Sequence, residues 1–317
     1  MRSDMKAQEK SMPKKGNWLG AMRKHSLKHI WISFGLGISL LAILVLLAQS
    51  VVQLFGEGTA GTIMRYALLG GTAGFAATAL GAVPALFLSR IPQRVEDMML
   101  GAAAGMMLAA SAFSLIIPGI EAGTSIVGSK TGGVGVVVIG MALGVLLMLC
   151  LDEFTPHEHE VAGAFGPGYE RFNRVWLFVF AITLHNLPEG MAIGVGFSHA
   201  DMAVGLPLTT AIALQDLPEG LAVAIALRSA GFPSWKAVLF AAGTGLLEPV
   251  GALLGVGLSS GLAVSYPIGL GLAAGAMIFV VSHEVIPETH RNGHQTPATI
   301  GLMFGFALMM VLDTALG

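Results

Sequence analysis

The chain has 317 residues, of which 54% are hydrophobic and only 11% are charged, and its formal net charge is −2. A soluble domain carries about 25% charged residues, so this chain has too few charges to cover a soluble protein of its length, and it is too apolar to be disordered. The nearly balanced charge also argues against nucleic acid as a partner. A mean hydropathy of +0.76 completes the prediction of a polytopic helical membrane protein.

Nine apolar stretches are long enough to cross a bilayer, whose hydrocarbon core of about 30 Å requires roughly 20 helical residues. They are 31–54, 61–89, 95–118, 131–151, 172–198, 202–228, 235–260, 264–287 and 296–316. We therefore predict an all-α, polytopic integral membrane helical bundle. Residues 1–30 form a basic segment before the first stretch, which is longer than the hydrophobic region of a signal peptide and is expected to remain as a helix.

Lysine and arginine are distributed unevenly between the two sides of this bundle. With the N-terminus inside, the basic segment and the inner loops hold 15 of the 17 Lys and Arg residues, and only Arg65 and Lys130 lie outside. Cytoplasmic loops of membrane proteins are enriched in these residues. The pattern predicts a cytoplasmic N-terminus and a periplasmic C-terminus. Recurrent pairs of glycines four residues apart, such as Gly190 and Gly194, predict close helix packing.

The fifth and sixth stretches contain a repeated polar motif. The sequence HNLPEG occupies 185–190 and QDLPEG occupies 215–220. Because consecutive spans run in opposite directions, the repeat is an inverted one, which is a common way to build a transporter binding site. Pro188 and Pro218 each remove a helical hydrogen bond and are expected to kink their helices.

Residues four positions apart share a helix face, so each motif directs a carboxylate and a nitrogen-bearing side chain toward one place. The residues concerned are His185, Asn186, Glu189, Gln215, Asp216 and Glu219. Ionisable side chains within a span are costly and indicate function. Imidazole combined with oxygen ligands suits a transition metal such as Zn²⁺, and the absence of thiolates from this set suits a site that must release its ion.

Glu248 of the seventh stretch adds a fourth acid to Glu189, Asp216 and Glu219. The four carboxylates together would balance two divalent cations, so we predict a site for two metal ions. For Asn186, Gln215 and Glu248, orienting the ligands is the alternative to binding the metal directly.

Three further groups carry weaker signals. His283 and Glu284 of the eighth stretch are candidates for an exit path or a third metal site, and core positions are an equal alternative. Met107 is a candidate thioether ligand, although a chain with 17 methionines also uses them for packing. His157 and His159 lie in the inner loop at 152–171, where they either capture metal or are simply solvated.

The two repeated motifs resemble those of the ZIP (Zrt/Irt-like) family of divalent metal transporters, most nearly its bacterial GufA-like branch, and the resemblance covers about 61–316. The family implies a homodimer, a binuclear site and an elevator-like alternating access in an eight-helix transport domain, here 61–317. The stretch at 31–54 is then an additional N-terminal transmembrane helix.

The resemblance also implies individual roles. Met107, His185, Glu189, Gln215 and Glu219 match the main metal position. Asn186, Asp216 and Glu248 match a second position that Glu189 and Glu219 bridge, and His283 and Glu284 match the inner release route.

We therefore expect a bacterial inner-membrane transporter that moves Zn²⁺, and also Cd²⁺ or Fe²⁺, into the cytoplasm, with the metal as transported substrate rather than cofactor. Lipid, metal ions and a second copy of the chain are the expected partners. A metalloprotease is disfavoured because Val161 stands where an HExxH motif beginning at His157 would need its second histidine, and we expect no enzyme. A proton-coupled carrier of another solute is the alternative.

Overall fold

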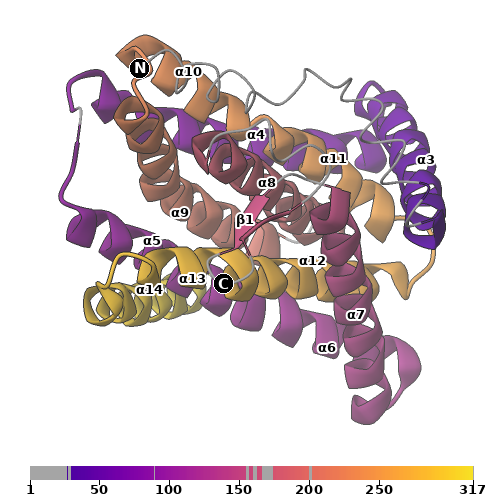
Figure 1. Ribbon diagram of the computed structural model, residues 1–317. Coiled ribbons are helices and arrows are strands. Elements are labelled where there is room, and N and C mark those ends of the chain that lie inside the picture. The colour runs from indigo at the N-terminus through magenta and orange to yellow at the C-terminus, as the bar shows by residue number, and fades with distance from the viewer. Residues whose placement is uncertain are drawn as a thin grey trace, which may run out of the picture.

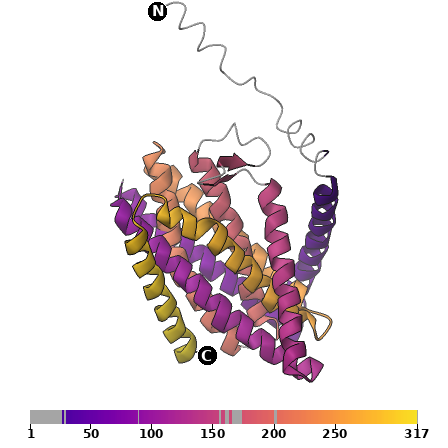
Figure 2. The same ribbon diagram turned by 60° about the horizontal axis from the view of Figure 1, so that its bottom comes forward.

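The computed structural model describes residues 27, 30–88, 90–154, 157–159, 163–165, 174–199 and 202–316. Most of the basic segment at 1–30 and of the loop at 152–171 therefore lies outside the described residues. Within the described ranges, each of the nine predicted stretches coincides with a helical segment. The helices lie side by side in one bundle, and the short β-hairpin lies at the opposite end of the bundle from the end of the last helix (Figures 1 and 2).

The helices are bounded as follows, in chain order: α3 Ile30–Leu54, α4 Thr59–Ala82 with a 3₁₀ turn at Val83–Leu86, α5 Gln93–Ala110, α6 Ile117–Val127, α7 Lys130–Phe154, α8 Arg174–Phe197, α9 Met202–Ser229, α10 Ser234–Thr244, α11 Leu247–Ser259, α12 Ser265–Val280, α13 Ile286–His290 and α14 Gln295–Leu316. Seven segments, counted over the described residues, are long and apolar enough to cross a membrane. The fold class predicted from the sequence is confirmed.

Two spans differ from their predicted form. The third extends to Val127 rather than ending near residue 118, and it ends where Gly128 adopts a left-handed conformation with φ of 78°. The seventh is divided, because α10 ends at Thr244 and α11 begins at Leu247. Pro249 cannot donate a backbone hydrogen bond to Gly245, which favours a break at this place. The break puts Glu248 in the first turn of α11.

Two helical turns widen into π-helical geometry, and each is followed two residues later by a proline. Ser111–Ile116 joins α5 to α6 and precedes Pro118, whereas Val281–Val285 joins α12 to α13 and precedes Pro287. The proline ring clashes with the carbonyl four residues earlier, and a wider turn relieves this clash. Such turns often occur at functional sites, and the second contains the two residues predicted for the release route.

Glycines bring several pairs of helices into backbone contact, among them α4 with α9, α8 with α11, α5 with α14 and α7 with α12. At each pair, a Cβ added to a glycine would collide with the backbone of the partner helix. The contacts place Gly220 against Thr78, Gly190 against Glu248, Gly101 against Ala298 and Gly140 against Ile268. The small-residue pairs of the sequence therefore define which helices are neighbours.

The predicted inner loop contains a short antiparallel hairpin, in which strand β1 (His157–His159) pairs with β2 (Gly163–Phe165). The sequence predicts a loop without strands at this place. At the edge of the bundle, α3 packs against α11 (Figure 1). The hydroxyl of Ser50 donates to the carbonyl of Leu253 at 2.8 Å, which fixes the additional helix to the rest of the chain.

Candidate metal-binding site

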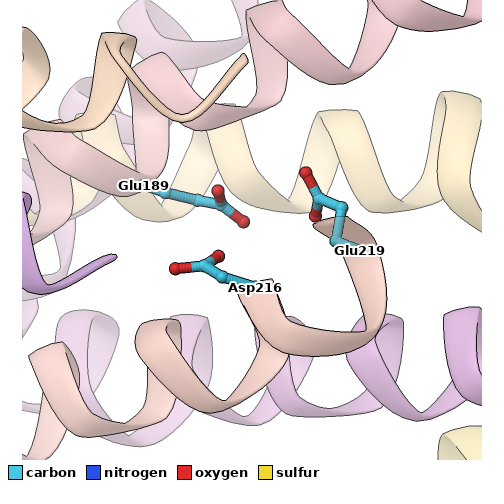
Figure 3. Close-up of side chains that lie close together, drawn as sticks. All are labelled: Glu189, Asp216 and Glu219. Carbon is cyan, nitrogen blue, oxygen red and sulfur yellow. The ribbon is translucent and has the colours of Figure 1, made fainter. Parts of the chain in front are cut away.

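The two motif helices carry the centre of the site, and both continue through their prolines without a break at Pro188 or Pro218. Carboxylates from both helices point toward one another (Figure 3). One oxygen each from Glu189 of α8 and from Asp216 and Glu219 of α9 lie within 4.8 Å of one another. All three side chains are at most 3% exposed. Three ionised carboxylates at this separation repel one another strongly unless cations or protons lie between them.

Glu248 extends this cluster from α11. Its Oε2 lies beside Gly74 of α4, where an added Cβ would collide with it and would approach Oδ2 of Asp216 to 3.2 Å. Its Oε1 accepts a hydrogen bond from the hydroxyl of Thr78 at 3.0 Å. Glu248, the fourth acid of the predicted two-metal set, therefore lies next to Asp216, and α4 supplies both the space for it and a donor that orients it.

The nitrogen-bearing motif residues are buried on the same two helices, and one of them contacts a carboxylate of the cluster directly. Gln215 donates from Nε2 to Oε1 of Glu189 at 2.5 Å, which joins the two motifs directly. Asn186 is buried, with 1% of its surface exposed. His185 is 2% exposed, and its Nε2 is 2.9 Å from Oε2 of Glu284. A buried histidine of the first motif thus contacts the π-helical turn after α12.

His283 lies apart from this cluster. Its Nε2 is 3.8 Å from Oδ2 of Asp152 at the end of α7, and its ring is stacked near Phe279. Its side chain is 41% exposed, whereas that of Glu284 is 12% exposed. The two residues predicted for the release route therefore point to different partners, and only Glu284 reaches the buried site.

Met107 lies within the main apolar core, 2% exposed, in a cluster that also contains Ile212 and Val281. Its carbonyl accepts a hydrogen bond from the hydroxyl of Ser111 at 2.8 Å. The described contacts of Met107 are thus those of a packing residue, and its role as a thioether ligand stays a prediction.

Nine buried polar atoms of these side chains lack a hydrogen-bond partner among the described residues. They are Nδ1 of His185, both amide atoms of Asn186, Oε2 of Glu189, Oε1 of Gln215, both carboxylate oxygens of Asp216, Oε1 of Glu219 and Oε2 of Glu248. Leaving buried polar groups unpaired is costly. Seven of these atoms are oxygens, and divalent cations are the ligands that would satisfy them at once. Nδ2 of Asn186 is a donor and needs an acceptor instead.

Thr78, Gly74 and Asp152 belong to the surroundings of the site but were not predicted from the sequence. A single threonine or glycine in an apolar helix resembles many others in this chain. Only the packing of α4 against α9 and α11 brings Thr78 and Gly74 to Glu248. In the sequence, Asp152 is distinguished only by its position at the predicted inner end of an apolar span. In the structure, its carboxylate lies beside the ring of His283.

The motif repeat extends to packing. Gly190, which ends the first motif, lies against the backbone of α11 at Glu248, and Gly220, which ends the second, lies against the backbone of α4 at Thr78. The two backbone neighbours are themselves joined by the Thr78 to Glu248 hydrogen bond. Four helices therefore meet around the cluster. In this repeat, the contact of α8 with α11 is the counterpart of the contact of α9 with α4.

Comparison with known proteins gives consistent results. The family model described as ZIP zinc transporter matches residues 157–313. Over 94% of its length the chain is 62% identical to the zinc transporter ZIPB of Bordetella bronchiseptica, of which 96% is covered. It is 43% identical to the zinc transporter GufA of Myxococcus xanthus over 79% of this chain and 97% of that protein. Human zinc transporter ZIP11 is 29% identical, with 79% and 97% covered.

Proposed function

Because this chain belongs to the ZIP family of zinc transporters and is a multi-pass membrane protein that transports divalent metal ions, we propose that the buried carboxylates of α8, α9 and α11 hold the transported ion. Family membership also confirms that the chain is a transporter and not an enzyme, and that the metal is its substrate rather than a cofactor. Zn²⁺ is the proposed main substrate, with Cd²⁺ and Fe²⁺ as further ones.

One observation carries this proposal. Glu189, Asp216 and Glu219 present oxygens within 4.8 Å of one another, in a region where nine buried polar atoms lack a partner within the described part of the chain. A folded bundle gains nothing from such a cluster by itself, since buried like charges are unfavourable. A cation that binds here supplies the missing partners.

The site is proposed to hold two ions. Glu189, Asp216, Glu219 and Glu248 carry four negative charges when ionised, which two divalent cations neutralise. One position combines Glu189 and Glu219 with His185, Gln215 and Met107. The other combines Asp216, Glu248 and Asn186 with the same two bridging glutamates.

Transport is proposed to run from the periplasm to the cytoplasm across a bacterial inner membrane, with the N-terminus inside, the C-terminus outside and two chains in a dimer. The basic segment 1–30 and the helix at 31–54 precede the transport domain at 61–317. His283 and Glu284 guide the ion toward the inner side. The distribution of Lys and Arg supports this orientation.

An elevator-like movement is the proposed mechanism. The residues of the cluster and those that support it belong to α4, α8, α9 and α11, which contact one another through glycines. A second group pairs α5 with α14 and α7 with α12 by similar contacts. Movement of the first group against the second would carry the site across the membrane and requires the contact between His185 and Glu284 to open.

The direct test is zinc influx into liposomes that contain the purified protein and a zinc-sensitive dye. Wild-type protein is expected to give influx that saturates with Zn²⁺, and Glu189→Gln and Glu219→Gln are each expected to lose it. Glu57→Gln serves as the matched control, because Glu57 is exposed in the turn between α3 and α4. Undiminished influx in both site variants would overturn the proposal.

A further inference from the structure

A basic hollow lies where the loop after α4 meets the end of α9 and the start of α10, and none of the acids of the metal-binding cluster lines it. It has a volume of about 700 Å³ and is lined by Arg90, Arg228, Ser229, Gly231, Phe232, Pro233 and Ser234. Two arginines contribute to this lining, and no acid does among the described residues. The pocket is therefore suited to an anion.

Its walls are arranged to donate hydrogen bonds. Arg228 lies in the last turn of α9, and its Nη1 donates to the carbonyl of Ala85 at 3.1 Å, which fixes the guanidinium at the pocket. An arginine has five N–H donors, so this contact leaves donors for a ligand. Arg90 is exposed on the other wall. A pair of guanidinium groups recognises phosphate oxygens in particular.

Backbone donors add to the two guanidinium groups. Ser234 begins α10, an 11-residue helix, and no side chain caps that end. The first N–H groups of a helix have no partner within it and carry a partial positive charge. Ser234 and Ser229, which both carry hydroxyl groups, are among the lining residues. Residues with arginine, hydroxyl and backbone amide donors thus line one hollow from two helices and a loop.

Exposed apolar side chains neighbour the lining residues in sequence on both sides. Phe87 is 86% exposed and Trp235 is 59% exposed, and Leu239 is similarly open on the next turn of α10. Lys236 lies over the ring of Trp235, with Nζ 5.4 Å from the ring centre. Tryptophan and lysine are typical of the membrane interface, where aromatic rings lie at headgroup level.

We propose that this pocket binds the phosphate of an anionic phospholipid, whose acyl chains lie over the apolar side chains of the rim. The lipid, rather than a soluble phosphate compound, is the ligand because apolar residues flank the basic lining on both walls. The pocket joins the loop after α4 to the end of α9 and the start of α10, and the neighbouring segments of α4 and α9 support the metal-binding cluster. A bound headgroup would hold these ends together.

Native mass spectrometry of the full chain in detergent tests this proposal with phosphatidylglycerol and phosphatidylcholine as probes. Wild-type protein is expected to bind one phosphatidylglycerol in preference to phosphatidylcholine. Each arginine near an anionic membrane surface contributes about fivefold in affinity, so Arg90→Gln and Arg228→Gln are each expected to lower the affinity for phosphatidylglycerol by about that factor. Arg94→Gln is the matched control, since Arg94 is an exposed arginine close by that does not line the pocket.

Two further measurements separate the possible results. Arg228→Gln loses its contact to Ala85 and can unfold, so the exposed Arg90 provides the decisive variant, with thermal melting as the control for folding. Equal affinity for phosphatidylglycerol in wild type and Arg90→Gln, or no preference over phosphatidylcholine, would overturn the proposal. Inorganic phosphate that raises the melting temperature through both arginines, without any binding of phosphatidylglycerol, would overturn the assignment to a lipid.

Discussion

Thr78 is the residue that most clearly serves the site without being a candidate metal ligand. Its hydroxyl donates to Oε1 of Glu248 at 3.0 Å and lies 3.3 Å from the carbonyl of Gly74. A donor to a ligating carboxylate fixes its orientation and leaves the other oxygen free for a metal. The other oxygen of Glu248, Oε2, is one of the atoms without a partner in the described structure.

Thr78→Val tests this role, because it removes the hydroxyl and keeps the shape of the side chain. We expect metal affinity, measured by calorimetric titration, to fall by about 10- to 100-fold, the usual cost of removing a residue that orients a ligand. Thr72→Val is the control, since the Thr72 hydroxyl donates only to the backbone of its own helix in the described contacts. An unchanged affinity in Thr78→Val would show that Glu248 needs no orientation.

At the scale of elements, the site depends on how closely α8 and α11 approach. Gly190, Gly194, Gly251 and Gly255 allow backbone contact along this pair, and Gly190 faces the backbone of Glu248 itself. The same glycine that ends the motif therefore sets the distance between Glu189 and Glu248. The repeat and its small residues were visible in the sequence, whereas the choice of partner helix was not, because it depends on packing between distant segments.

Gly190→Ala is expected to displace α11 and so to separate Glu248 from the cluster. Overpacking of this kind costs about 1–3 kcal/mol, which thermal unfolding measures, and zinc influx should fall strongly in the fraction that folds. Gly135→Ala provides the comparison, because a Cβ at Gly135 of α7 meets nothing within 4 Å. Normal influx in Gly190→Ala would contradict the close contact between these helices.

The helix boundaries illustrate what local pattern predicts. The nine stretches follow from hydrophobicity alone, and the described helices coincide with them. The extension of the third span to Val127 was missed, because glycines and Glu121 resemble a loop in sequence. The break before Glu248 and the two π-helical turns were also missed. Their prolines indicate a distortion but do not determine its form.

At the scale of the whole molecule, the distribution of Lys and Arg and the inverted repeat both predict a bundle in which consecutive spans run in opposite directions. The motif residues are buried and near one another, as their spacing indicates, but the contact of His185 with Glu284 joins residues almost a hundred positions apart. No spacing rule connects such residues. They meet because α12 and its π-helical turn pack against α5 and α8.

The proposed orientation is tested by cysteine labelling. Cys150→Ser removes the single cysteine of the chain, and Ser260→Cys or Thr296→Cys then introduces one at an exposed position. In intact cells, a membrane-impermeant maleimide is expected to label Ser260→Cys, which lies between α11 and α12, and not Thr296→Cys at the start of α14. Labelling in the opposite pattern would reverse the topology and the inferred direction of transport.

The central claim is that the carboxylates of α8, α9 and α11 hold two transported metal ions, and the most direct measurement is anomalous X-ray scattering from crystals saturated with Cd²⁺. Two peaks are predicted within the cluster of Glu189, Asp216, Glu219 and Glu248, and only one is predicted in Glu248→Gln. A single peak in wild type at saturating Cd²⁺, or peaks that lie away from these four residues, would contradict the account.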